Sequence, residues 1–320
     1  MEMVEETIPV LITTCNRYQH LAKCLEALGT CKYADKTKVY IAVDYPPSQD
    51  YIVGYNKTRE LLDELVNNNP FFEMIVIYRS TNLGPNNNAQ QLIEYAEKKY
   101  KAFIRMEDDI VVAPAFLDYC YSLVGDAGNN IFAVCGYVSK NLPVEKIESN
   151  FLMRGCNTWG TVYFTEKMRD IERWRSSDKV IKFCLNPMKM LKLRFYSIGA
   201  FNIIVMGMLV GKTKTLFDNG IIPALTDVII CMYMIEMNYY AICPAQNLVE
   251  NIGLDGSGQN SRVGDETNFI RDYSKDYKFT NVSKRVLRSK GDKNVHDFIF
   301  NKIVCLNYFR WLLLSRKFKV

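Results

Sequence analysis

The sequence predicts an α/β fold in which helices cover a parallel sheet, and two observations support this prediction. Short apolar runs alternate with helix-length amphipathic segments four times in roughly the first 120 residues, a pattern typical of parallel sheets with helical crossovers. Each apolar run also ends in polar residues, and the ligands of such sheets bind outside the carboxyl ends of the strands.

The first three units follow one another closely. The predicted strands are 8–13, 39–43 and 74–78, and the helices that follow them are 18–29, 55–66 and a segment around Leu92 to Ala96. In the first helix Leu21, Cys24, Leu25 and Leu28 recur at helical spacing, which gives it one apolar face. Polar residues follow these strands at Asn16-Arg17, at Asp44 and at Asn82-Leu83-Gly84.

The fourth strand, 102–106, stops at three successive carboxylates, Glu107, Asp108 and Asp109. Adjacent carboxylates repel one another unless a cation neutralises them. A divalent metal that carries substrate phosphates would do so, and one carboxylate with phosphates and waters is an ordinary ligand set for Mg²⁺. The alternative is an acidic turn, because aspartate is common in turns. Pro114 suits the first turn of a following helix.

Composition narrows the class of protein. The 320 residues are 48% hydrophobic and 23% charged, as expected of a chain that folds around a large core. The net charge of +5 is modest, and Lys and Arg form no dense stripe. We therefore expect no nucleic-acid partner, and favour phosphate-bearing small substrates or an anionic membrane surface.

The cysteines and the absence of sorting signals predict a cytoplasmic protein. The 10 cysteines are scattered and form no CxxC pair, and there are 2 histidines, so we expect buried free thiols rather than a zinc site. The acidic N-terminus has no apolar signal region, and no stretch has the length of a membrane span.

The last part of the chain, 266–320, is predicted to be a helical extension. From His296 onward, aromatic and aliphatic residues are interleaved with Lys302, Arg310, Arg316 and Lys317. A basic helix with aromatic residues can lie in a membrane interface. The alternative is a C-terminal helix docked on the rest of the protein, and the sequence leaves both open.

Five motifs occur in a fixed order. They are Thr13-Thr14-Cys15-Asn16-Arg17, Asn82-Leu83-Gly84, Glu107-Asp108-Asp109 followed by Ala113-Pro114-Ala115-Phe116, Trp159-Gly160, and 247–258 (NLVENIGLDGSG). Together they resemble the motifs of GT-A-fold glycosyltransferases of the family-2 type that assemble bacterial polysaccharides. The acidic motif is also similar to that of the N-acetylglucosaminyltransferase that starts complex N-glycans. The resemblance runs from Ile8 to about Ser261.

The resemblance implies a GT-A (Rossmann-like) fold over 1–265 with a mixed, mainly parallel sheet. In it, 1–110 is the nucleotide-sugar half and 111–265 the acceptor half. It implies that Asp109 holds Mn²⁺ or Mg²⁺. The donor-binding residues are then Thr13, Asn16, Arg17, Asp44, Asn82, Gly84, Glu107, Asp108 and Trp159. Arg17 could pair with phosphate or stack on a base, and Asp44 could accept from uracil or ribose; a helix cap or a surface ion pair is the alternative for either.

A catalytic base follows from the same resemblance. The relatives' W-D-x-R-W segment falls on 226–230, where Asp227 is kept but both tryptophans and the arginine are absent. Asp227 would deprotonate the acceptor in an inverting displacement; as alternatives, it is a stabilising acid in the first turn of a helix, or Asp218 is the base. Relatives often carry x-H-C at 259–261, where this chain has Gln259-Asn260-Ser261.

By resemblance, the expected activity is metal-dependent transfer from a UDP-sugar, such as UDP-GlcNAc or another hexose, to a hydroxyl of a glycan or glycolipid at the inner face of the cell membrane. A non-catalytic scaffold with the same fold is the rival, because the residues around Asp227 have changed. A sugar-nucleotide pyrophosphorylase is disfavoured, since 14–17 contains no glycine.

Overall fold

A computed structural model describes residues 7–125, 127–138, 149–209, 226–256, 282–287 and 295–317. Its centre is a nine-stranded sheet of order β11-β7-β9-β6-β8-β4-β1-β2-β3. The strands are β1 (Val10–Thr14), β2 (Lys38–Val43), β3 (Glu73–Tyr78), β4 (Ala102–Glu107), β6 (Ile131–Cys135), β7 (Asn150–Met153), β8 (Thr161–Phe164), β9 (Tyr240–Cys243) and β11 (Val282–Leu287). β5 (Ile110–Val112) and β10 (Val249–Asn251) form a separate antiparallel pair.

The sheet is mixed and mainly parallel, as expected. β3, β2, β1 and β4 run parallel to one another, while β8 lies antiparallel between β4 and β6. β9 is parallel to β6, β7 is antiparallel to β9, and β11 is parallel to β7. The carboxyl ends of β1, β2, β4, β6 and β9 therefore share one edge of the sheet.

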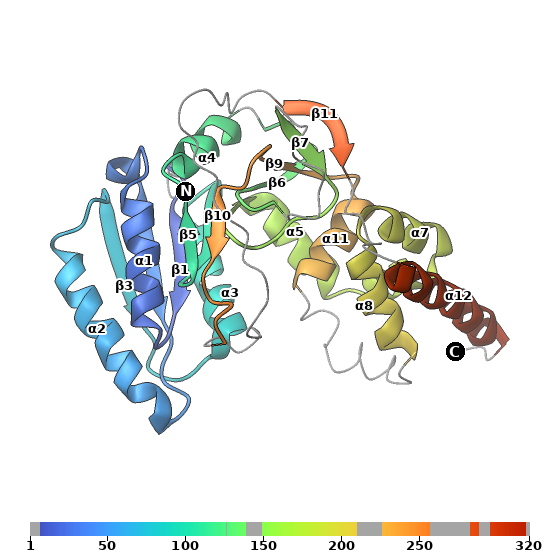
Figure 1. The fold of residues 1–320 in the computed structure, drawn as a ribbon, viewed down its shortest axis with the longest axis horizontal. Coiled ribbons are helices and arrows are strands. Elements are labelled where there is room, and N and C mark those ends of the chain that lie inside the picture. Colours follow the sequence, from blue (N-terminus) through green and yellow to red (C-terminus); the bar gives the residue numbers. More distant parts are fainter. Residues whose placement is uncertain are drawn as a thin grey trace.

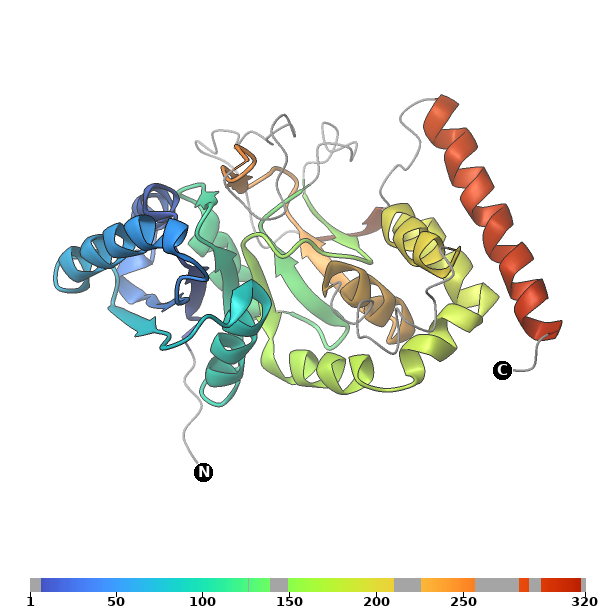
Figure 2. The same ribbon diagram turned by 90° about the horizontal axis from the view of Figure 1, so that it is seen from below.

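Helices cover both faces of this sheet (Figure 2). They are α1 (Tyr18–Gly29), α2 (Ile52–Val66), α3 (Gly84–Glu97), α4 (Phe116–Val124), α5 (Thr165–Arg175), α6 (Lys179–Leu185), α7 (Pro187–Tyr196), α8 (Ile198–Leu209), α11 (Thr226–Glu236) and α12 (Val295–Lys317). Because strand side chains alternate between faces, Val10 and Ile12 pack with α1, α2 and α4 in one core, whereas Leu11 packs with α3, α5 and α11 in the other.

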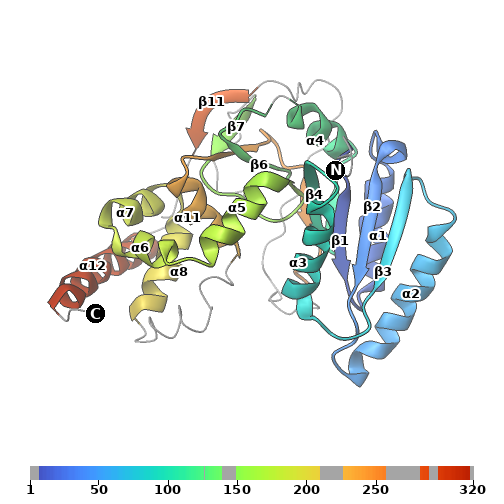
Figure 3. The ribbon, with the colours of Figure 1, turned by 180° about the vertical axis from the view of Figure 1, so that it is seen from behind.

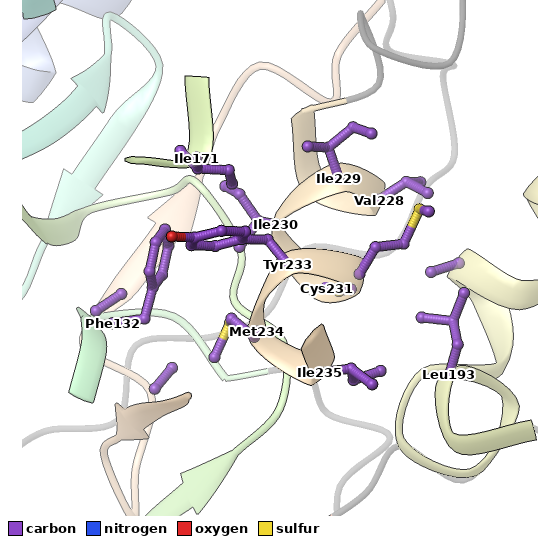
Figure 4. Packing of buried hydrophobic residues seen from close by; sticks show 14 of the residues in the cluster. Phe132, Ile171, Leu193, Val228, Ile229, Ile230, Cys231, Tyr233, Met234 and Ile235 are labelled. Carbon is purple, nitrogen blue, oxygen red and sulfur yellow. The ribbon is translucent and has the colours of Figure 1, made fainter. Parts of the chain in front are cut away.

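Helix α11 is buried on all sides, in keeping with its uniformly apolar sequence. Figure 4 shows Val228, Ile230 and Tyr233 among side chains of α5, α7 and β6, including Ile171, Leu193 and Phe132. The first turn of a helix, named above as the alternative setting of Asp227, is present here. Asp227 stands at its exposed beginning, so the core fixes the position of this carboxylate at the surface.

The acidic triplet is followed by structure that differs in detail from the expectation. The chain forms β5 after Asp109, a separate strand that the sequence did not predict, and α4 begins at Phe116 rather than at Pro114. Pro114 precedes that helix by two residues. The sequence does not predict β5 because this segment becomes a strand by pairing with β10, which lies far away in the sequence.

The C-terminal helix docks on the rest of the protein. Val304, Tyr308 and Leu312 of α12 are buried, and Tyr308 Oη donates a hydrogen bond to the carbonyl of Cys184 at 3.1 Å. This confirms the docked-helix alternative. The expected extension is not entirely helical, since β11 joins the sheet beside β7. Among the described helices, none combines the length and apolar character needed to cross a membrane.

All 10 cysteines carry free thiols, and seven of them are buried. This agrees with the expectation of unpaired core cysteines.

Figure 1 and Figure 3 show how the elements are arranged along the molecule. The strands β1, β2 and β3 lie with α1 and α2 at one end, and the helices α7, α8 and α12 lie at the other.

Candidate active site

The carboxyl ends of β1, β2 and β4 bring the predicted site residues to one edge. Thr14 is in register with Val43, directly before Asp44, and Thr13 is in register with Glu107. Parallel neighbours in register end together. The loops that carry Arg17, Asp44 and the acidic triplet therefore start side by side, as the alternating pattern of the sequence predicts.

Arg17 bridges the last two acids of the triplet. Its Nη2 contacts Asp108 Oδ1, and its Nη1 lies 2.9 Å from Asp109 Oδ2. Asp108 and Asp109 are 2% and 5% exposed, so this ion pair is shielded from water. The cation that balances the two carboxylates in this structure is an arginine, which the sequence placed only near phosphate or a base.

Asp108 is also held by Thr14, whose Oγ1 donates to Asp108 Oδ2 at 2.7 Å. The pKa of Asp108 is raised to about 7: burial is the main cause and the charge of Asp109 adds to it, while Arg17 and Thr14 act in the opposite direction. Thr14 was not among the predicted site residues. The alternation of side chains along β1 could have suggested it, because Thr14 is the last residue of the strand before the turn.

Asp109 meets one requirement of a metal ligand. Its Oδ1 is buried and has no hydrogen-bond partner, although buried carboxylate oxygens are normally paired. Within the described ranges, no three His, Cys, Asp or Glu side chains gather into a ready-made metal site. The residues therefore fit a cation held by one carboxylate oxygen, with the rest of its shell supplied by substrate phosphates and water.

The segment 249–255 covers the acid pair. β10 pairs with β5, and the Ile252 amide donates to the carbonyl of Asp109 at 2.9 Å. The Gly253 amide donates to Asn251 Oδ1 at 2.8 Å, and His20 Nε2 lies 3.1 Å from Asp255 Oδ2. The sequence singled out this block as a motif but gave it no role in the site.

Gly253 is in its place because a side chain would collide with the acid pair. A Cβ there would lie 2.8 Å from Asp109 Cγ and 2.9 Å from Arg17 Nη1. We expect Gly253→Ala to lower the free energy of unfolding by about 1–3 kcal/mol through overpacking and to displace the Asp109 carboxylate. Thermal unfolding and Mn²⁺ titration would measure the two effects.

The matched control is Gly199→Ala, because a Cβ at Gly199 meets nothing within 4 Å. If Gly253→Ala is no less stable than this control and binds Mn²⁺ as the unchanged protein does, the close approach has no energetic consequence.

Asp44 joins the loops that follow β2 and β3. Its Oδ1 accepts hydrogen bonds from the amides of Tyr45 and Leu83, each at 2.9 Å, and its Oδ2 lies 3.4 Å from Asn82 Nδ2. Asn82 also donates to the carbonyl of Tyr45 at 2.5 Å. Gly84 follows with a φ of 74° and open space above it, so a non-glycine residue would be strained there. Asp44 thus holds the loops after β2 and β3 together.

Three other predicted residues lie near this edge without a common contact. Thr13 is partly exposed on β1, and the backbone of Asn16 packs closely against Gly54 of α2. The ring of Trp159 stands edge-on to that of Tyr137 with 4.7 Å between centroids. Its amide nitrogen donates to Asn157 Oδ1 at 2.8 Å.

Asp227 and the acidic triplet are linked through Arg105. Arg105 Nη2 lies 3.9 Å from Glu107 Oε1, because alternate residues of β4 share a face. Although Asp227 is exposed, the surrounding protein partly desolvates its carboxylate and raises its pKa, and the charge of Arg105 partly offsets this. The pKa of Glu107 is raised mainly by burial, with Asp227 contributing. Arg105 was not predicted to be a site residue.

Two other positions that the sequence analysis considered, Asp218 and 259–261, lie outside the described residues.

A mixed, mainly parallel sheet with helices on both faces and a shielded acid pair at its carboxyl edge makes this an α/β protein with a candidate site at that edge. A sequence profile described as "Glycosyl transferase family 2" matches residues 10–197. That match covers more than half of the chain, and the protein belongs to glycosyl transferase family 2.

Several solved structures are similar in fold. S. aureus TarS 1–349 in complex with UDP-GlcNAc is 12% identical, with a TM-score of 0.37 over 52% of this chain and 47% of its own. The mannosyltransferase PcManGT from Pyrobaculum calidifontis, in complex with GDP-Man and Mn²⁺, is 14% identical, with a TM-score of 0.38 over 54% and 49%. The chain thus spans about half the length of each. No curated protein matches the sequence significantly.

Proposed function

We propose that this protein is a metal-dependent, inverting glycosyltransferase. It moves a sugar from a UDP-sugar, UDP-GlcNAc or another hexose, to a hydroxyl group of a glycan or glycolipid. Because the chain belongs to family 2, one observation is the main support for this proposal. Two carboxylates belong to the group of charges around β4: Asp109, which has an unpaired buried oxygen, and Asp227.

The donor half of the site consists of the loops after β1, β2, β3 and β4. Asp44, Asn82 and Gly84 provide the surface for uracil and ribose, with Thr13 and Asn16 at the same edge. Arg17 is the cation nearest to the diphosphate and is held by Asp108 and Asp109, while Glu107 lies at the same edge and pairs with Arg105. Trp159, beside Tyr137, offers an aromatic face to the sugar.

Asp109 is the residue that would hold Mn²⁺ or Mg²⁺, through its unpaired Oδ1. When bound, the cation supplies positive charge to the departing diphosphate. Arg17 contributes a second positive charge to the same region and keeps the acid pair compact before the donor arrives.

Asp227 is the proposed general base. It is exposed at the start of α11, so an acceptor hydroxyl can reach it, and its raised pKa makes it a stronger base than an ordinary aspartate. It takes the hydroxyl proton while the acceptor oxygen bonds to the anomeric carbon from the face opposite the diphosphate. The bond to the diphosphate breaks, UDP leaves with the electron pair, and the configuration inverts.

The most informative experiment is a donor screen that measures UDP release with and without Mn²⁺, against a panel of glycan and glycolipid acceptors. Acceptor-stimulated, metal-dependent release from one donor supports the proposal. The rival is a non-catalytic scaffold. The scaffold alternative is favoured by Ile230, which is buried in the core at a position where the relatives carry a tryptophan. Absence of turnover with every donor and acceptor pair would support it.

We further propose a cytoplasmic location in contact with the inner face of the cell membrane. Ile303, Leu306 and Leu313 on the outer face of α12 are 51%, 70% and 65% exposed, and Lys302 and Arg310 are exposed with them. An apolar face flanked by cations can lie on an anionic bilayer. The opposite face of α12 stays docked on α8.

Replacing the outer face tests this location better than removing α12, which would uncover α8. We expect Leu306→Asp with Leu313→Asp to reduce co-sedimentation with anionic vesicles by about tenfold or more, because each leucine loses apolar contact with the acyl region. Val53→Asp on α2, where the valine is 67% exposed, is the matched control. Equal sedimentation of all three proteins would contradict the proposal.

A further inference from the structure

A cavity of about 290 Å³ lies beside α7, away from the site described above. Arg154, which follows β7, and Asn238, which precedes β9, line it together with one face of α7. In Figure 1 and Figure 3, α7 lies at the end of the molecule opposite α1 and α2. The donor loops and this cavity are therefore separate places in the fold.

Arg154 is held rigidly at this cavity. Its Nη2 donates to Asn238 Oδ1 and, at 2.6 Å, to Tyr240 Oη. Its guanidinium carbon lies 4.4 Å from the ring centroid of Tyr240 and 5.1 Å from that of Tyr196. Asn238 adopts a left-handed φ of 58°, which asparagine tolerates. Arg154 is thus preorganised, with little side-chain freedom left to lose on binding.

Among the described residues, no carboxylate balances the charge of Arg154. The side chain is 8% exposed, yet in the described parts of the chain it forms no ion pair with a carboxylate, and its Nε is buried without an acceptor. Lys189, also on α7, is neutralised by Glu236 at 2.6 Å. A buried guanidinium without an anion is costly, so the cavity favours an anionic ligand.

The rest of the lining is amphiphilic. Met188, Leu191 and Phe195 recur at helical spacing on α7 and are 65%, 38% and 52% exposed, so one helical face presents large apolar side chains to the surface. Lys192 adds an exposed cation at the rim. None of the described residues that line the cavity is acidic. Cations within an apolar surface complement a molecule with an anionic head and a hydrocarbon chain.

We propose that this cavity binds the phosphate head group of an anionic lipid. The phosphate pairs with Arg154 and Lys192, and the first part of the hydrocarbon chain lies on Met188, Leu191 and Phe195. This site is independent of the donor site and of the outer face of α12. It gives the protein selective recognition of one head group, where the α12 face provides only general attraction to a bilayer.

The test uses the full chain and a short-chain phosphatidic acid kept below its micelle concentration, titrated in a calorimeter. We expect saturable binding of one molecule per chain. Arg154→Met and Lys192→Glu should each weaken it roughly ten- to a hundredfold, the range for hydrogen bonds to charged groups. The matched control is Arg173→Met, which removes an exposed arginine paired with Asp170 on α5 and should leave binding unchanged.

Because Arg154 is buried, Lys192→Glu and the exposed Met188→Ser keep the test valid if Arg154→Met unfolds. Equal affinity for inorganic phosphate would overturn the lipid assignment in favour of a free anion. Equal affinity for a short-chain phosphatidylcholine would overturn the role of charge. UDP release by the Lys192→Glu variant should stay at its original rate, so failure here and failure of the proposed transferase activity are distinguishable.

Discussion

Asp227→Asn is expected to lower the rate of sugar transfer by roughly 10²–10⁴-fold while leaving donor binding unchanged, because an amide cannot take the proton of the acceptor hydroxyl. Transfer should also fall in the unchanged protein as pH drops through the pKa of Asp227, since only the ionised carboxylate is a base. That pKa is raised because the surrounding protein partly desolvates the carboxylate, so the loss begins at a higher pH than it would for an ordinary aspartate.

The effect of Asp227→Asn on the stability of the protein distinguishes a catalytic base from an acid that only stabilises the first turn of α11. A carboxyl whose pKa is higher in the folded than in the unfolded state favours folding when protonated, and this contribution is lost as pH rises through the folded-state value. Asp227→Asn should therefore not destabilise the protein at neutral pH. Asp118→Asn, which removes the first-turn acid of α4 paired with Lys32, is the comparison. Full transfer activity in Asp227→Asn would exclude the base assignment.

Asp109→Ala is expected to abolish the dependence of transfer on Mn²⁺ and to lower the rate about 10³-fold, since several kcal/mol of charge stabilisation of the leaving diphosphate is lost. The reason is local: Asp109 Oδ1 is the unpaired carboxylate oxygen of the shielded acid pair. Mn²⁺ binding with and without UDP, followed by electron paramagnetic resonance, measures the loss directly and does not require turnover.

The control for Asp109→Ala is Glu107→Gln. Glu107 belongs to the same acidic triplet, but it contacts Arg105, whereas Asp109 contacts Arg17. We expect that variant to retain Mn²⁺ binding with a modest loss of donor affinity. The metal assignment to Asp109 is wrong if Asp109→Ala and Glu107→Gln bind Mn²⁺ equally well in the presence of UDP.

The sequence alone predicted the first four strands of the sheet and the edge at which they end. Apolar runs such as 39–43 and 102–106 became buried strands because burial of aliphatic side chains dominates local structure. Parallel neighbours bring their carboxyl ends together, so the turns after Thr14, Val43 and Glu107 had to meet. The position of Asp227 at the start of a buried helix followed in the same way from the apolar run after it.

The partner of each charge was decided only by the tertiary structure. Arg17 bridges Asp108 and Asp109, and Gly253, from a much later part of the chain, packs against that pair. Arg154 lies beside α7 with no carboxylate partner among the described residues. Hydrophobic periodicity records which face of an element is buried, but it carries no information about which distant side chain arrives there. That depends on strand register and helix packing, which form when the whole chain folds.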